Sequence, residues 1–205
     1  MCVARCATAF GKVMNRIIVQ FDGLKYAGKT TLILQTAQLL FKNGYSVTVI
    51  PEWRTNDYGP QEIQSWIEYT FDERNHSDWV SNESVSDIVL VDRGFLSLKA
   101  CLDANFPQLN NLWQNKIMTK VVESISSRNM YVFVTANRDT IETRAMKRDQ
   151  TLKNVDVAQL QDIYKKLYDQ LGVKPLEIDT TCLDSEQCAL ITYKSICEYK
   201  NSIGG

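Results

Sequence analysis

The sequence contains little of what metal centres, disulfide frameworks and membrane spans require. Its 205 residues include one histidine, His76, and six cysteines without a C-x-x-C pair, so no zinc-ligand spacing is present. We therefore expect free thiols in a reducing cytoplasm. No apolar run approaches the length of a membrane span. Lys plus Arg (23) nearly balance Asp plus Glu (24), and this balance predicts neither a membrane surface nor a general nucleic-acid surface.

The chain also lacks internal repeats, low-complexity stretches and Pro/Gly-rich linkers, which favours a single domain over residues 14–205. That length allows a substantial core. Residues 1–13 carry basic residues and no acid, but they lack the sustained apolar segment of a secretion signal. We expect them to form a disordered N-terminal extension.

Residues 23–31 contain a complete G-x-x-x-x-G-K-[ST] phosphate-binding loop. A β-branched run at 16–21 predicts a buried strand before the loop, and apolar spacing over 31–43 predicts a helix after it. A glycine turn that matches the motif by chance would lack this context. The sequence therefore predicts a site for a nucleoside triphosphate.

Each residue type that this motif specifies has a chemical task. Gly23 and Gly28 let the backbone curl so that its N–H groups point at a phosphate, next to the positive end of the following helix. Lys29 would reach the β- and γ-phosphates, and Thr30 would offer its hydroxyl to Mg²⁺. The loop residues expected to contact ATP are Gly23, Leu24, Lys25, Tyr26, Ala27, Gly28, Lys29, Thr30 and Thr31.

Predicted strands alternate with predicted helices along the rest of the chain. The strands are expected at 16–21, 45–50, 87–92, 129–135 and 176–179. The helices are expected at 31–43, 61–71, 111–126, 138–148, 157–171 and 185–200. This alternation indicates the α/β class, with a parallel sheet of about five strands covered by helices on both faces in three layers.

Charged residues follow the second and third predicted strands, where ligands of parallel sheets bind. Asp92 stands like the carboxylate that holds a Mg²⁺ shell, although it could also cap the next segment. Arg93 could neutralise a phosphate or form a surface ion pair. Glu52 could bind a sugar hydroxyl, act as a base, or orient Arg93 or Arg54.

A basic helix is expected after the fourth strand. Arg144 and Arg148 are four residues apart and share one helix face, with Lys147 beside them. Such a face is often only solvated. In phosphoryl transfer, however, cations brought in on closure stabilise the developing charge.

These motifs together resemble the thymidylate kinase family of nucleoside monophosphate kinases, over residues 16–200. The segments that carry the resemblance are Phe21-Asp22-Gly23, Gly28-Lys29-Thr30-Thr31, Pro51-Glu52, Phe71-Asp72-Glu73-Arg74, Val91-Asp92-Arg93 and the stretch from Arg144 to Arg148. The run Pro51-Glu52-Trp53-Arg54-Thr55 is closer to eukaryotic and viral members. The resemblance implies a P-loop kinase fold with a lid around residues 138–153. Dimerisation is common in that family, so a homodimer is compatible with the resemblance.

The resemblance also implies roles for individual residues. Arg74 would meet the base of the acceptor nucleotide, with an aromatic neighbour such as Phe71 packed against the base. Arg93 would bind the acceptor phosphate, with Arg54 as a second cation, while Asp92 and Glu52 would organise Mg²⁺ and these arginines. The residues implied to act in catalysis are Lys29, Arg93, Arg144 and Arg148.

The chain departs from the family pattern at four positions. Lys25 replaces an acid that supports the acceptor sugar, and Tyr26 replaces a loop arginine that assists transfer. Gly94 replaces an aromatic residue after Asp-Arg, and Thr70 stands where an aromatic ring is expected, so Phe71 or Tyr69 would take its place.

The sequence thus predicts a Mg²⁺- and ATP-dependent nucleoside monophosphate kinase that converts dTMP to dTDP, with nucleotides as its partners. One alternative is a deoxynucleoside kinase, in which Glu52 would take a proton from a 5′-hydroxyl. Another is a catalytically silent nucleotide-binding module, which the departures at Lys25, Tyr26 and Gly94 would permit.

Overall fold

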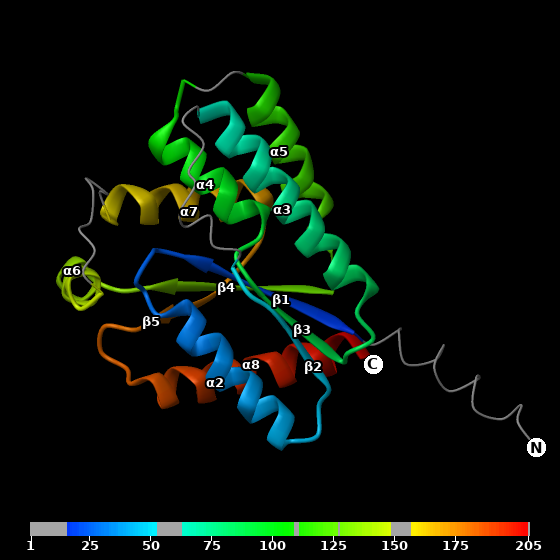
Figure 1. Ribbon diagram of the computed structural model, residues 1–205. Helices are drawn as coiled ribbons and strands as arrows, with labels where there is room; N and C mark the ends of the chain where they lie inside the picture. The colour runs from blue at the N-terminus through cyan, green and yellow to red at the C-terminus, as the bar shows by residue number, and fades with distance from the viewer. Residues whose placement is uncertain (1–15, 53–62, 109–110, 127, 149–156, 205) are drawn as a thin grey trace, which may run out of the picture.

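The computed structural model describes residues 16–52, 63–108, 111–126, 128–148 and 157–204. Five parallel strands form one sheet in the order β2-β3-β1-β4-β5. They are β1 (Ile17–Gly23), β2 (Val47–Ile50), β3 (Ile88–Asp92), β4 (Asn129–Thr135) and β5 (Leu176–Asp179). Helices cover both faces of this sheet, as Figure 1 shows. The predicted three-layer α/β/α architecture with a central parallel sheet is confirmed.

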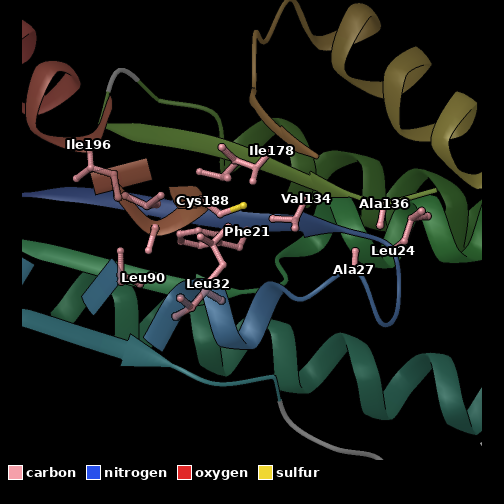
Figure 2. Close-up of a cluster of buried hydrophobic side chains, with 14 of the residues drawn as sticks. Phe21, Leu24, Ala27, Leu32, Leu90, Val134, Ala136, Ile178, Cys188 and Ile196 are labelled. Atoms are coloured by element: carbon pink, nitrogen blue, oxygen red, sulfur yellow. The ribbon is translucent and has the colours of Figure 1, made fainter. Parts of the chain in front are cut away.

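One face of the sheet is covered by α2 (Lys29–Lys42) and α8 (Ser185–Gly204), which pack against each other. All residues of β1 and β3 are buried, as expected for central parallel strands with helices on both faces. In Figure 2, Phe21 and Leu32 lie at the centre of the cluster under this layer, and the cluster continues to Leu24 and Ala27 of the phosphate-binding loop. The core therefore supports the loop directly.

The other face carries α3 (Ile63–Glu83), α4 (Phe95–Asn105), α5 (Asn111–Glu123) and α7 (Val157–Leu171). Helix α4 packs against both α5 and α7, and the sequence analysis did not predict it. Six of its eleven residues are buried, from Phe95 to Leu102. Because α4 is apolar on several sides, it lacks the one-sided 3.6-residue pattern by which surface helices are identified.

Helix α3 is longer than predicted, since it continues to Glu83 rather than ending near Phe71. Its buried side includes Thr70, Arg74, Ser77 and Ser81. The three hydroxyl groups donate to the carbonyl oxygen four residues earlier in the helix. The first half of α3 buries the apolar Ile67 and Phe71, whereas the second half buries mainly polar side chains and was therefore not predicted from the apolar pattern.

Helix α6 (Arg138–Met146) follows β4, and the Asn137 side chain caps it by accepting from the Thr140 amide at 2.9 Å. It is the first part of the predicted lid at 138–153; residues 149–153 and the predicted extension at 1–13 lie outside the described residues. Within the described ranges, no helix is long and apolar enough to span a bilayer. The four cysteines in these ranges are free thiols, as predicted.

Candidate active site

The phosphate-binding loop leaves the end of β1 and turns sharply into α2. Gly23 has φ +130° and Gly28 has φ +95°, values at which other residues are strained. A Cβ atom on Gly23 would also lie 2.0 Å from the carbonyl oxygen of Val134. Gly28 precedes α2, which begins at Lys29, earlier than the predicted start at Thr31. The first turn of α2 offers backbone N–H groups to an anion at the loop.

Two side chains outside the loop hold its backbone. The hydroxyl of Thr180, just after β5, donates to the carbonyl oxygen of Ala27 at 2.7 Å. Arg144 of α6 donates through Nη1 to Thr180 Oγ1 (2.8 Å) and to the carbonyl oxygen of Tyr26 (3.3 Å). Its Nη2 donates to the Thr180 carbonyl oxygen at 3.0 Å. Arg144 thus ties α6 to the loop, and Thr180 is a residue that the sequence analysis missed.

Lys29 is buried and points back into its own loop. Its ammonium group donates to the carbonyl oxygens of Leu24 (2.7 Å) and Gly23 (3.3 Å). Burial, together with the positive charge of Arg93, lowers the pKa of Lys29 from 10.5 to about 7, although nearby carboxylates oppose the shift. An anionic phosphate in the loop would restore the charged form.

Thr30 and Asp92 form the candidate metal site. Thr30 donates its hydroxyl hydrogen to Asp92 Oδ2 at 2.7 Å. Asp92 Oδ1 is buried without a hydrogen-bond partner. Hydroxyl and carboxylate oxygens are preferred ligands of Mg²⁺, so both residues fit the predicted ion. Among the described residues, no group of three or more His, Cys, Asp or Glu side chains is arranged to hold a metal ion.

Arg93 and Glu52 meet beside the loop. Arg93 Nε lies 2.7 Å from Glu52 Oε1, and Arg93 Nη1 donates to the carbonyl oxygen of Gly23 at 3.2 Å. Arg93 has φ +70°, an uncommon backbone conformation for this residue type that often occurs at functional sites. Burial alone would lower its pKa, but Glu52 and other neighbours raise it overall, so the guanidinium stays charged. Burial raises the pKa of Glu52, but the positive charges of Arg93, Lys29 and Arg74 outweigh this effect, so the pKa is lowered overall.

Arg74 of α3 reaches the same place. It is 6% exposed, and its Nη1 donates to the carbonyl oxygen of Arg93 at 3.0 Å. Its Nε is buried without a hydrogen-bond partner. Burial lowers the pKa of Arg74, while Glu52 opposes that shift. Two arginines and one glutamate therefore lie close together near Lys29, and their role in binding an acceptor stays a prediction.

The ring expected beside the acceptor base is packed in the core. Phe71 is 3% exposed and lies 5.3 Å from Phe95 and 5.6 Å from Trp113, measured between ring centroids. Lys116 Nζ covers the Phe71 ring at 4.3 Å. Tyr69, the other candidate ring, is 52% exposed.

Tyr26, which replaces the loop arginine, gathers cations around its ring. Lys25 Nζ lies 5.1 Å and Arg148 Cζ 5.9 Å from the ring centroid. Both cations are exposed, and such contacts are weak at exposed sites. Arg148 can therefore leave the ring at little cost, whereas Arg144 is held by three hydrogen bonds.

A buried hydrogen-bond network lies behind Gly23. The fully buried Asp22 accepts from the hydroxyl groups of Ser97 and Tyr168, the latter at 3.2 Å. Tyr164 donates to the Gly23 carbonyl oxygen at 3.4 Å and lies 3.1 Å from Ser97 Oγ. Burial raises the pKa of Asp22 despite these hydrogen bonds. The sequence analysis missed this network, because the two tyrosines have the spacing of ordinary core residues.

The structure around position 94 explains why a glycine fits there. A Cβ atom there would lie 2.2 Å from Oε1 of Gln20, a side chain that is 3% exposed. Any side chain at position 94 would therefore require the carboxamide of Gln20 to move. Arg54, the predicted second phosphate cation, lies outside the described residues.

The strand order and the loop between β1 and α2 define the class: this is an α/β protein with the P-loop kinase fold. No protein-family model matches the sequence, and no curated protein does. Among solved structures, thymidylate kinase from Ehrlichia chaffeensis matches with a TM-score of 0.59 at 15% sequence identity. The match covers 88% of this chain and 98% of that chain. At this identity the likeness shows the fold, and the predicted eukaryotic or viral subtype gains no support from it.

Proposed function

We propose that this protein is a Mg²⁺- and ATP-dependent nucleoside monophosphate kinase, with dTMP as the favoured acceptor. The observation that carries the proposal is the convergence of Lys29, Thr30–Asp92 and Arg93–Glu52 at the carboxyl edge of the sheet. Phosphoryl transfer needs a donor cradle, a metal position and cations for the acceptor phosphate, and these groups supply all three.

The part of the site that would bind ATP consists of the phosphate-binding loop and of Arg144 and Thr180, which hold the loop backbone. Backbone N–H groups of residues 23–31 would hold the ATP phosphates, and Lys29 would turn from the Gly23 and Leu24 carbonyl oxygens toward them. Thr30 and Asp92 would hold Mg²⁺, which neutralises phosphate charge when bound. Arg144 would fix the loop, and Arg148 would supply the mobile cation that the loop lacks at Tyr26.

The acceptor half consists of Arg93, Arg74 and Glu52. A phosphate oxygen of the acceptor is already an anion, so the transfer requires no strong base. Arg93 would hold this phosphate in line, because its guanidinium stays charged and is aimed by Glu52. The low pKa of the Glu52 carboxylate and its ion pair make it a weak base. That point disfavours the deoxynucleoside kinase, which needs a base for a 5′-hydroxyl.

The choice of dTMP rests on the resemblance to thymidylate kinases and on the structural likeness to one of them. Lys25 is exposed and cannot accept the hydrogen bond that an acid would take from the acceptor sugar. Gly94 brings no ring toward the sugar. We therefore expect weaker discrimination against ribose than in relatives with an acid and a ring at these positions.

The test is ADP formation from ATP and Mg²⁺ with each ribo- and deoxynucleoside monophosphate and each parent nucleoside. The proposal predicts turnover with dTMP or dUMP. Turnover with nucleosides alone would replace it by the deoxynucleoside kinase. ATP binding without turnover of any acceptor would favour the silent nucleotide-binding module.

A further inference from the structure

Asp22, near the end of β1, is a buried carboxylate without a role in the proposed phosphoryl transfer. Its side chain is 0% exposed, so it touches no substrate itself. It lies beside the end of β3, because the preceding Phe21 pairs with Asp92 in the parallel register. A buried carboxylate is costly unless hydrogen-bond donors surround it, so its partners indicate what the residue does.

The first partners of Asp22 lie at the beginning of α4. The carboxylate accepts from the backbone N–H of Gly94, the N-cap residue, and from the hydroxyl group of Ser97 in the first turn. Gly94 makes no side-chain capping hydrogen bond of its own. A carboxylate at the start of a helix satisfies free N–H groups and interacts favourably with the positive end of the helix dipole. Asp22 therefore caps α4 from a separate strand.

The residue before this cap is Arg93, whose backbone lies in the left-handed region at φ +70°. That conformation is unfavourable for a residue with a side chain and persists only where the surroundings fix it. The amide of Arg93 donates to the Phe21 carbonyl oxygen at 3.0 Å, and its carbonyl oxygen accepts from Arg74 at 3.0 Å. Asp22 accepts from the next amide along the chain. These hydrogen bonds together fix the turn from which the Arg93 side chain leaves.

A second set of partners comes from α7. Tyr168 donates to Asp22 Oδ2 at 3.2 Å, and the hydroxyl group of Tyr164 lies 3.1 Å from Ser97 Oγ. Burial raises the pKa of both tyrosines, that of Tyr164 to about 12, so both hydroxyl groups keep their protons. Both rings also pack against Phe133 of β4. The carboxylate is therefore held between β1, α4 and α7.

We propose that Asp22 is a positioning residue of the acceptor side, which acts through Arg93. By capping α4 it holds the left-handed turn from which the guanidinium reaches Glu52 and would reach the acceptor phosphate. The inference rests on the proposed function, since it assigns Asp22 to the acceptor part of that site. Because ATP would contact the loop and not this turn, loss of the cap should raise the KM of the acceptor more than the KM of ATP.

Initial rates of Asp22→Asn and Tyr168→Phe, with dTMP and ATP varied in turn, test the proposal. Asp22→Asn keeps the size of the side chain but removes its charge, so we expect the acceptor KM to rise at least about tenfold and the KM of ATP to change less than about threefold. Tyr168→Phe removes one donor to the same carboxylate and should give a smaller change of the same kind. A purely structural role would lower Tm and the active fraction and leave both KM values unchanged.

Tyr131→Phe is the matched control. It removes another buried tyrosine hydroxyl from the same aromatic cluster, since the Tyr131 ring lies 6.2 Å from that of Tyr168. This hydroxyl donates to the Ser124 carbonyl oxygen at 3.3 Å rather than to Asp22. Both KM values should therefore stay unchanged in this variant.

The side-chain NMR signal of the Arg93 Nε–H group reports on the turn without any turnover. In the wild-type protein its ion pair with Glu52 at 2.7 Å should give a distinct, exchange-protected signal, which Arg93→Lys would assign. We expect the signal to be lost in Asp22→Asn, shifted in Tyr168→Phe and unchanged in Tyr131→Phe. Should Asp22→Asn not fold, Tyr168→Phe decides by the same two readouts.

The outcomes separate this inference from the proposed function. An unchanged acceptor KM and an unchanged Arg93 signal in the folded variants, or equal rises in both KM values, would overturn the inference and leave the kinase proposal standing. A wild-type protein that phosphorylates no acceptor, but loses the Arg93 signal in Asp22→Asn, would contradict the proposed function and still support Asp22 as the group that fixes the turn.

Discussion

The donor side of the candidate site rests on apolar packing, whereas the second half of α3, which begins near Arg74, buries mainly hydroxyl and charged side chains. Leu24 and Ala27 of the loop are 2% and 0% exposed and belong to the main core (Figure 2). On α3, the buried Ser77 and Ser81 bond within their own helix. Apolar packing fixes a loop rigidly, while side chains satisfied within a helix hold that helix to no particular register. The donor side is therefore preorganised, and the acceptor side can adjust to its ligand.

The largest expected effect is a difference in kcat and Tm between variants of two arginines: Arg144, which lies in α6, and Arg148, which lies just after it. Arg148→Ala should lower kcat by about 10³, the low end for arginine-finger contributions, with little change in Tm because Arg148 is exposed. Arg144→Ala should lower both kcat and Tm, since it removes one hydrogen bond to the loop at Tyr26 and two to Thr180, which itself holds the loop. Lys147→Ala is the control, as an exposed cation beside Arg148. Losses of less than tenfold in kcat for both arginine variants would refute the cation argument.

The next effect concerns Thr180 and Arg144, whose side chains hold the backbone of the phosphate-binding loop. Thr180→Val keeps the shape of the side chain but leaves the Ala27 carbonyl oxygen without its donor, so we expect a loss of about 1–3 kcal/mol in the free energy of unfolding. The KM for ATP should rise with it. Denaturant unfolding and initial rates measure the two quantities. Thr119→Val, on the exposed side of α5, is the control. An equal loss of unfolding free energy in this variant would contradict a particular role for the hydrogen bond from Thr180 to the loop.

A smaller effect depends on pH. Because the pKa of Lys29 falls from 10.5 in the unfolded chain to about 7 in the folded chain, burial of its charge destabilises the ligand-free fold fully below pH 7. This cost is released as the pH rises from 7 toward 10.5. Lys29→Met should therefore raise Tm near pH 6 and raise it by less at pH 9, because most of the cost has been released at the higher pH. A Tm difference that is constant between these pH values would contradict the lowered pKa.

The smallest effect tests the polar contact of α3. Ser81→Ala should change the free energy of unfolding by no more than about 0.5 kcal/mol, because the lost hydrogen bond is local and alanine favours helix. Leu98→Ala in α4, which is buried in the same layer, should cost about 2–5 kcal/mol. Similar losses for the two variants would remove the contrast between the packing of α3 and that of the apolar core.

Residues that belong to a motif, or that follow directly after a predicted strand, could be predicted from the sequence. The pairing of Thr30 with Asp92 and the meeting of Arg93 with Glu52 agree with expectations from the motif and from the strand ends. Long-range partners could not be predicted, because a single threonine such as Thr180 has no local pattern. Helix α4 was missed for the opposite reason, since its apolar residues are too continuous to show a helical period.

The most direct test of the central claim follows the γ-phosphoryl group itself. Wild-type protein would be incubated with γ-labelled ATP, Mg²⁺ and dTMP, and the products would be separated to find the molecule that carries the label. The account predicts labelled dTDP, and its loss in Lys29→Met. Label that stays in ATP, or appears only as inorganic phosphate, while dTMP and each nucleoside monophosphate tried in its place remain unlabelled, would contradict it.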